Sequence, residues 1–144
     1  MKAGIKIEGA DEIDAALKRM ATVTRREVVE RALLAGGEEI AAEARRLVPA
    51  DTGNLRASII ASTTAKGMNS AGGSSGSGDV KVFVGPEQGR EAEHDGFYGH
   101  MVEFGTNDTA AEPFMRPAFD GPAARRAAAA IGEVLASEID KQAI

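Results

Sequence analysis

The sequence predicts an α+β domain: a small antiparallel sheet with a long hairpin, packed against two long helices and one shorter helix. Helical periodicity covers the stretch before Pro49 and the stretch after Pro122. Between them, two short segments rich in β-branched residues, 58–65 and 80–84, predict strands on either side of a Gly/Ser-rich stretch. Helices at the ends and strands in the middle are typical of a sheet with helices packed on one face.

The composition limits the size of the core and the classes of function. A chain of 144 residues corresponds to a single domain, 1–144, with a modest core. Aromatic residues make up only 4%, so the core must consist of Ala, Val, Ile and Leu, and burial between subunits would compensate for its small size. The absence of Cys excludes disulfides, thiolate metal sites and Cys nucleophiles.

The net charge and the hydropathy pattern exclude further classes. A net charge of −5 and a pI near 5.1 oppose sequence-specific nucleic-acid binding, which depends on Lys and Arg contacts to phosphates. No apolar run approaches the about 20 residues that span a bilayer, and the first residues lack the apolar stretch of a signal peptide. We therefore expect a soluble protein made in the cytoplasm.

The first two helices are predicted from their start and stop signals. Asp11 can cap a first helix, whose apolar residues recur at helical spacing. Thr24 and Glu27 have the spacing of a capping box and predict the start of a second helix. Pro49 ends this helix, because the residue before a proline is pushed out of the α region.

The second helix contains a pair of glycines within its apolar stripe. We predict that its core-facing residues are Val29, Leu33, Gly36, Ile40, Ala44 and Leu47. Each Gly inside a helix costs about 1 kcal/mol relative to Ala. Gly36 and Gly37 therefore indicate either a tolerated weak spot or the close approach of another helix or subunit, and we take them as a candidate subunit contact.

The middle and the end of the chain follow from composition. Residues 66–79 are mainly Gly and Ser, so we expect a flexible loop between the two strands, able to reach a neighbouring chain. Gly85-Pro86 should stop the second strand. Residues 98–104 should form a short helix, and the Ala-rich stretch 123–141 the last long one.

One short motif raises the possibility of an enzyme. Asp51-Thr52-Gly53 is also the signature of aspartic proteases, in which two close carboxylates share one proton. Those proteases place the Asp after an apolar strand in an all-β fold, whereas here it follows a helix and Pro49. We interpret Asp51 as a turn or cap residue and keep a homodimeric protease as the weaker alternative.

A metal site can be assembled from the sequence only loosely. The candidate ligands are His94, His100 and Glu103, with Glu91, Glu93 and Asp95 nearby. Their spacing matches no strong metal-binding motif. We expect no metal, no cofactor and no catalytic residue.

Two further segments are rich in residues that fix backbone shape rather than in reactive groups. Their motif residues are Thr52, Gly53, Leu55, Arg56, Glu103, Phe104, Gly105, Thr106, Pro113, Phe114, Arg116 and Pro117. We expect Phe104 to lie in the core and Gly105 to end a short helix with positive φ. We favour an ion pair of Glu103 with Arg56 or Arg116, because Arg can bind a carboxylate bidentately.

Together with Pro49, Val84-Gly85 and Tyr98, these motifs occur in the order that is found in the phage minor tail proteins typified by the gp10-like protein of phage HK97. The chain resembles this family from about the second helix to the last one. The resemblance implies a structural virion protein of a tailed phage or phage-derived particle. Such a protein forms a ring, commonly six-fold, at the head-proximal end of the tail, and acts in tail completion or head–tail joining.

The resemblance also implies partners and a location. The neighbours of the ring would be a head-completion (stopper) protein and tail tube subunits. DNA would pass through the lumen without sequence-specific binding, and the particle would assemble in the bacterial cytoplasm. A head-closure protein is the alternative within the same class.

Overall fold

The computed structural model describes residues 9–23, 25–49, 53–64, 80–89, 92 and 94–141. The helices are α1 (Ala10–Val23), α2 (Arg26–Leu47), α3 (Asn54–Ser58), α4 (Gly99–Phe104), α5 (Met115–Asp120) and α6 (Ala123–Lys141). The strands β1 (Ile59–Ser62) and β2 (Phe83–Pro86) pair as a two-stranded antiparallel sheet. The fold is therefore α+β, with a small hairpin packed on helices, as the sequence predicts. None of these helices is long and apolar enough to cross a membrane.

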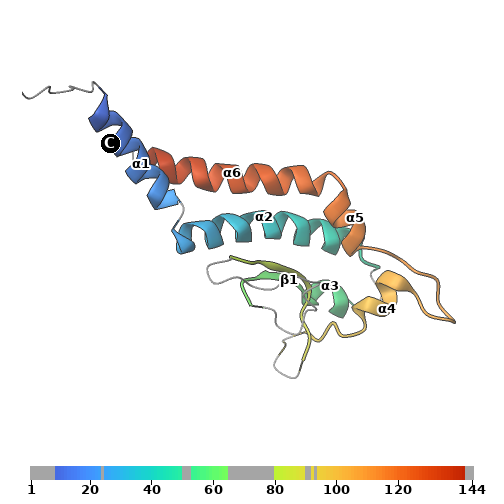
Figure 1. Ribbon diagram of the computed structural model, residues 1–144. Helices are drawn as coiled ribbons and strands as arrows, with labels where there is room; N and C mark the ends of the chain where they lie inside the picture. Colours follow the sequence, from blue (N-terminus) through green and yellow to red (C-terminus); the bar gives the residue numbers. More distant parts are fainter. Residues whose placement is uncertain are drawn as a thin grey trace, which may run out of the picture.

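Helix α2 is the central layer of the molecule. Figure 1 shows α6 along one side of α2 and the hairpin with α3 along the other. Helices α2 and α6 run antiparallel: Arg31 near the start of α2 binds Glu138 near the end of α6 at 2.7 Å. Helix α1 packs against α6 and α2 and extends beyond them at one end.

The two glycines of α2 allow α6 on one side and the hairpin on the other to approach closely. A Cβ atom at Gly36 would lie 2.7 Å from Cγ1 of Ile131 and 3.1 Å from the carbonyl oxygen of Ala127, both on α6. A Cβ atom at Gly37 would lie 3.0 Å from Cγ1 of Val82, next to β2. The close approach is thus made by another helix and the hairpin of the same chain. A subunit contact directly at this pair would require α6 or the hairpin to move.

The predicted stripe of α2 is wrong in part, because the helix is covered on two sides. Its buried residues are Val28, Ala32, Gly36, Gly37, Ala41 and Ala44. Only Gly36 and Ala44 belong to the predicted stripe, whose other members are half-buried. A single stripe describes a helix with one covered face, whereas α2 has two.

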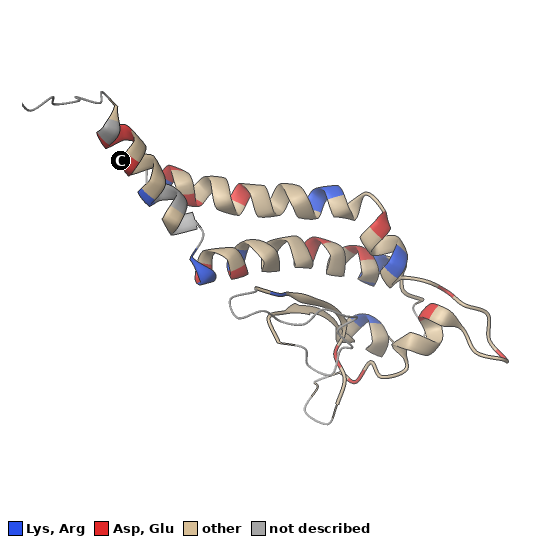
Figure 2. Cartoon of the chain, viewed as in Figure 1, with Lys and Arg blue, Asp and Glu red and all other residues tan. Residues whose placement is uncertain are grey.

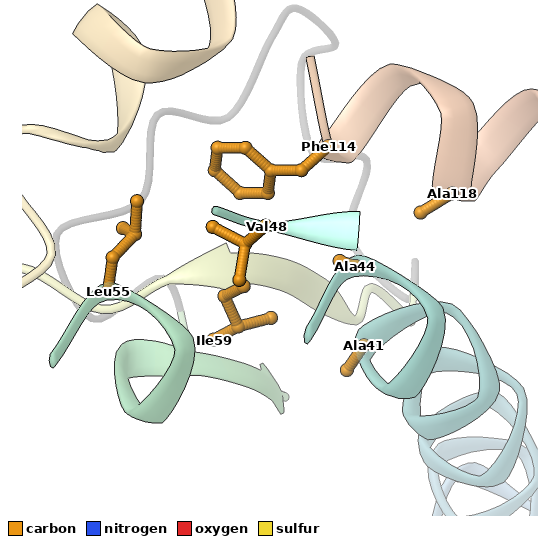
Figure 3. Packing of buried hydrophobic residues seen from close by; sticks show 7 residues of the cluster. All are labelled: Ala41, Ala44, Val48, Leu55, Ile59, Phe114 and Ala118. Carbon is orange, nitrogen blue, oxygen red and sulfur yellow. The ribbon is translucent and has the colours of Figure 1, made fainter. Parts of the chain in front are cut away.

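The core is small and mainly aliphatic. Its buried cluster consists of Ala41, Ala44, Val48, Leu55, Ile59, Phe114 and Ala118. Figure 3 shows Phe114, Val48 and Ile59 next to one another, with Leu55 on one side and the three alanines on the other. Phe114 and Ile59 are its largest fully buried side chains. The end of α2, the start of α5 and β1 therefore share one core.

Both strands differ from their predicted ranges: β1 is shorter, 59–62 rather than 58–65, and β2 is shifted, 83–86 rather than 80–84, so it runs through Gly85 to Pro86. Pro86 is opposite Ile59, and the N–H of Glu87 donates to the carbonyl oxygen of Ser58 at 2.8 Å. Hydrogen-bonded pairs alternate along an antiparallel ladder, so Pro86 occupies a non-hydrogen-bonded position, where its missing N–H leaves no gap. The carbonyl of Ile59 points to the other side of β1. There Arg45 donates to it from Nε at 3.0 Å and from Nη2 at 2.8 Å.

Other local predictions differ from the structure at element boundaries. Asp11 lies inside the first turn of α1 rather than before it. Helix α2 begins at Arg26 after an N-cap at Arg25 that makes no side-chain cap bond, and Thr24 lies outside the described residues. The short helix α3 was not predicted, because its five residues are too few to show a period. The predicted loop 66–79 also lies outside the described residues.

Ion pairs join α2 to α6 near the end opposite Arg31. The carboxylate of Glu43 lies 2.6 Å from Arg46 and 3.3 Å from Arg126 of α6. The hydrogen bond from Arg46 lowers the pKa of Glu43 below its ordinary value of 4.5, and Arg126 adds to this, whereas burial acts in the opposite direction. The ionised form of Glu43 is therefore favoured in the folded state.

Replacing Glu43 by Gln should make stability less dependent on pH. A carboxyl whose pKa is lowered by folding stabilises the fold above its ordinary pKa, and this contribution is lost as the pH falls through the lowered value. The deficit of Glu43→Gln relative to the wild type should therefore be full near neutral pH and shrink below about pH 4.5. Urea unfolding across this range measures it. A deficit of Glu43→Gln that stays constant as the pH falls would contradict the assignment.

Replacing Gly36 by Leu should lower the free energy of unfolding by about 1–3 kcal/mol, because the side chain would enter space filled by Ile131 and Ala127. Gly132→Leu is the matched control. A Cβ atom at Gly132 meets nothing within 4 Å, so the gain in helix propensity should raise stability by up to about 1 kcal/mol. Denaturant unfolding of the two variants checks the prediction, and equal stabilities would refute it.

Candidate functional site

The segment after α4 folds back on that helix. The N–H of Glu112 donates to the carbonyl of Val102 at 2.8 Å, and the N–H of Thr106 donates to Thr109 at 2.9 Å. Gly105 has φ +74°, and a Cβ atom there would lie 2.7 Å from the backbone nitrogen of Ala111. The prediction that Gly105 ends a helix with positive φ is therefore confirmed. Any other residue here would be strained and would collide with the returning chain.

Glu103 caps helix α5. Its Oε2 accepts the N–H groups of Phe114 at 2.7 Å and Met115 at 2.9 Å, and its Oε1 accepts the N–H of Arg116 at 3.0 Å. The first N–H groups of a helix have no partner within the helix. Here the carboxylate of Glu103, from helix α4, is the acceptor for these N–H groups. Its negative charge is also favoured by the positive end of the helix dipole.

The predicted ion pair of Glu103 is therefore wrong. Glu103 binds the backbone of Arg116 rather than its guanidinium group, which is 84% exposed and lies 3.9 Å from the exposed Asp120. Arg56 is exposed and donates from Nε to the carbonyl oxygen of Arg45 at 3.0 Å. A backbone N–H satisfies a carboxylate as well as an arginine does, and residue types alone could not distinguish the two.

The two phenylalanines of the motifs have opposite environments. Phe104, expected in the core, is 78% exposed, whereas Phe114 is 1% exposed and lies in the core (Figure 3). The Glu103 carboxylate fixes the backbone of Phe114 and so holds its ring in place. Pro117 lies in the first turn of α5, where its missing N–H costs nothing.

An open hollow of about 880 Å³ lies between the end of α2, α3, α4 and the returning loop. Its apolar wall includes Pro49, Leu55, Tyr98, Met101 and Val102. Gly53 and Thr106 also line it, so the structure brings residues of both motifs to one place. Around the hollow, Asp108 and Glu112 are acidic, and none of the described residues that line it is Lys or Arg. Figure 2 shows the same acidic loop between α4 and α5.

Three of the candidate metal ligands, His100, Asp95 and Glu103, have other partners. The His100 ring hydrogen-bonds through Nδ1 with the carbonyl of Phe97 at 2.7 Å, and Asp95 accepts from the N–H of Phe97 at 3.1 Å. Glu103 is occupied by backbone groups of α5. Within the described part of the chain, no group of three or more His, Cys, Asp or Glu residues could hold a metal ion.

Several candidate residues lie outside the described part. Glu91 and Glu93 of the candidate metal site are among them, as are Asp51 and Thr52 of the Asp-Thr-Gly segment. Gly53 is described, with φ +79° at the start of α3, which fits a turn at this segment.

The model of the family described as "Bacteriophage HK97-gp10, putative tail-component" matches residues 11–105. This range is well over half of the chain, so the chain belongs to the HK97-gp10-like family and is a structural tail component of a phage-type particle. No curated protein and no solved structure matched.

Replacing Glu103 by Ala should lower the free energy of unfolding by about 1–3 kcal/mol, because three backbone N–H groups lose their acceptor. Arg116→Ala removes only an exposed side chain and should change stability by less than about 0.5 kcal/mol. Chemical unfolding of the two variants tests the cap. A larger loss for Arg116→Ala than for Glu103→Ala would restore the ion-pair hypothesis.

Proposed function

We propose that the protein completes the tail at its head-proximal end, as a terminator or head–tail joining component that forms a ring, commonly six-fold in proteins of this kind. Membership of the HK97-gp10-like family carries this proposal. The motif residues support it, because they hold a loop, a helix start and a hollow in shape rather than gathering reactive groups.

The partners follow from the position in the particle. A head-completion (stopper) protein would bind one face of the ring and tail tube subunits the other. A net charge of −5 suits a ring through which DNA slides, since acidic groups repel phosphates and do not grip them. The ring would be part of the virion neck and would assemble in the bacterial cytoplasm.

The protein acts in this proposal without substrate, metal or cofactor, and is not an enzyme. A head-closure protein is the second candidate, since it would share the neck and a ring form. The two differ in what their loss does. Loss of a head-closure protein lets packaged DNA escape, whereas loss of a tail-completion protein leaves filled heads beside unjoined tails or tails of uncontrolled length.

Deleting the chain from its particle tests the function. We expect filled heads and separate tails by negative-stain microscopy, with joining restored by the wild-type chain and by Arg116→Ala supplied in trans. Emptied heads beside complete tails of normal length would indicate the head-closure function. Normally joined particles without the chain would refute both.

A further inference from the structure

The exposed large apolar side chains of the described residues gather at two ends of the molecule. They are Ile13 and Leu17 of α1, Ile139 of α6, Phe97 before α4, Met101 and Phe104 of α4, and Phe119 of α5. Ile139 follows Glu138, which binds the start of α2. The first three therefore lie at the end of the molecule where α2 begins, and the other four lie at the end where α4 and α5 are found (Figure 1).

The length of α2 separates these two ends. Helix α1 leads into the first turn of α2, and Pro49, which lines the hollow, follows its last turn. A helix of 22 residues is about 33 Å long at 1.5 Å per residue. One chain therefore cannot cover its own hollow with its own α1 while α2 stays intact.

The two ends differ in shape. Ile13 and Leu17 are four residues apart on α1, so they form one apolar ridge on a helix that extends beyond the body (Figure 1). The other end is concave, with Leu55, Met101 and Val102 in the wall of the hollow. The ridge of one copy therefore has a shape that can fit the hollow of another copy, whereas two ridges or two hollows cannot fit each other.

The charges beside the ridge are balanced within α1. Asp14 lies between Ile13 and Leu17 and pairs with Lys18 at 2.7 Å, so this part of the helix brings no net charge to the loop at the hollow, which carries Asp108 and Glu112. The acids Asp11 and Glu12 lie in the first turn of α1. The helix can therefore enter with Leu17 towards the hollow and keep its acidic first turn outside.

We propose that α1 of one copy docks through Ile13 and Leu17 into the hollow of the next copy. This inference rests on the proposed ring, for which it names the interface. The contact joins different surfaces of identical chains, so it propagates head to tail and closes into a ring if the rotation between neighbours allows. Each copy fills one hollow and offers one ridge.

Two single variants of the full chain and their mixture test this proposal. Leu17→Glu spoils the ridge and keeps the hollow, whereas Met101→Glu spoils the hollow and keeps the ridge. Each variant alone should associate at least about tenfold more weakly than the wild type, because a charge replaces an apolar group that is buried on docking. Mixed in equal amounts, they should form a dimer of one copy each that cannot grow, because its one contact uses the intact ridge and the intact hollow and the two remaining surfaces are both spoiled. Analytical ultracentrifugation measures the species, and circular dichroism checks that each variant is folded.

Ala128→Glu, on an exposed position of α6 away from both ends, is the matched control and should leave the wild-type species unchanged. A wild type that stays monomeric at all concentrations would overturn the proposal. So would wild-type oligomers in either variant, or a folded mixture without the dimer. Loss of association in Ala128→Glu alone would assign the interface to the outer face of α6. These results concern the interface only, because the deletion phenotype of the particle decides the function separately.

Discussion

The structure depends on a double close packing at the middle of α2. Gly36 and Gly37 are neighbours in sequence, and they admit α6 on one side of the helix and the hairpin on the other. Each glycine weakens the isolated helix by about 1 kcal/mol, and the helix is stable because both sides are covered. The small core follows from the same geometry, since layers that approach so closely leave room mainly for alanines.

A second constraint orders the far end of the molecule. The carboxylate of Glu103 holds the start of α5, and Gly105 allows the chain between them to return to α4. Phe114 is thereby brought into the core, where it joins α5 to the end of α2 (Figure 3). The same contacts shape the hollow, because α4 and the returning loop form one side of it. Glu103 and Gly105 thus act on the shape of the backbone.

The sequence predicts the regular parts of this fold well and the contacts between them poorly. Helix α6 has the predicted range 123–141. Its Ala-rich composition favours a helix, and the proline before it marks where that helix starts. The positive φ of Gly105 is a local property, and it was predicted correctly. The partner of Glu103 and the burial of Phe104 depend on how the loop returns, which no local pattern encodes. Arg45 was missed because its partner is a backbone carbonyl, and a side chain that binds backbone leaves no signature in residue types.

The antiparallel pairing of α2 with α6 also determines when the molecule can fold. The ion pairs between these helices join residues 83 and 107 positions apart in the chain. During synthesis, α2 is complete long before α6 leaves the ribosome, and its α6-facing side stays uncovered for that time. Contacts so distant in sequence carry a large loop-closure cost and form slowly. The nascent chain must therefore wait for its last helix, and the exposed alanine-rich face of α2 is its vulnerable surface for chaperones and for premature association.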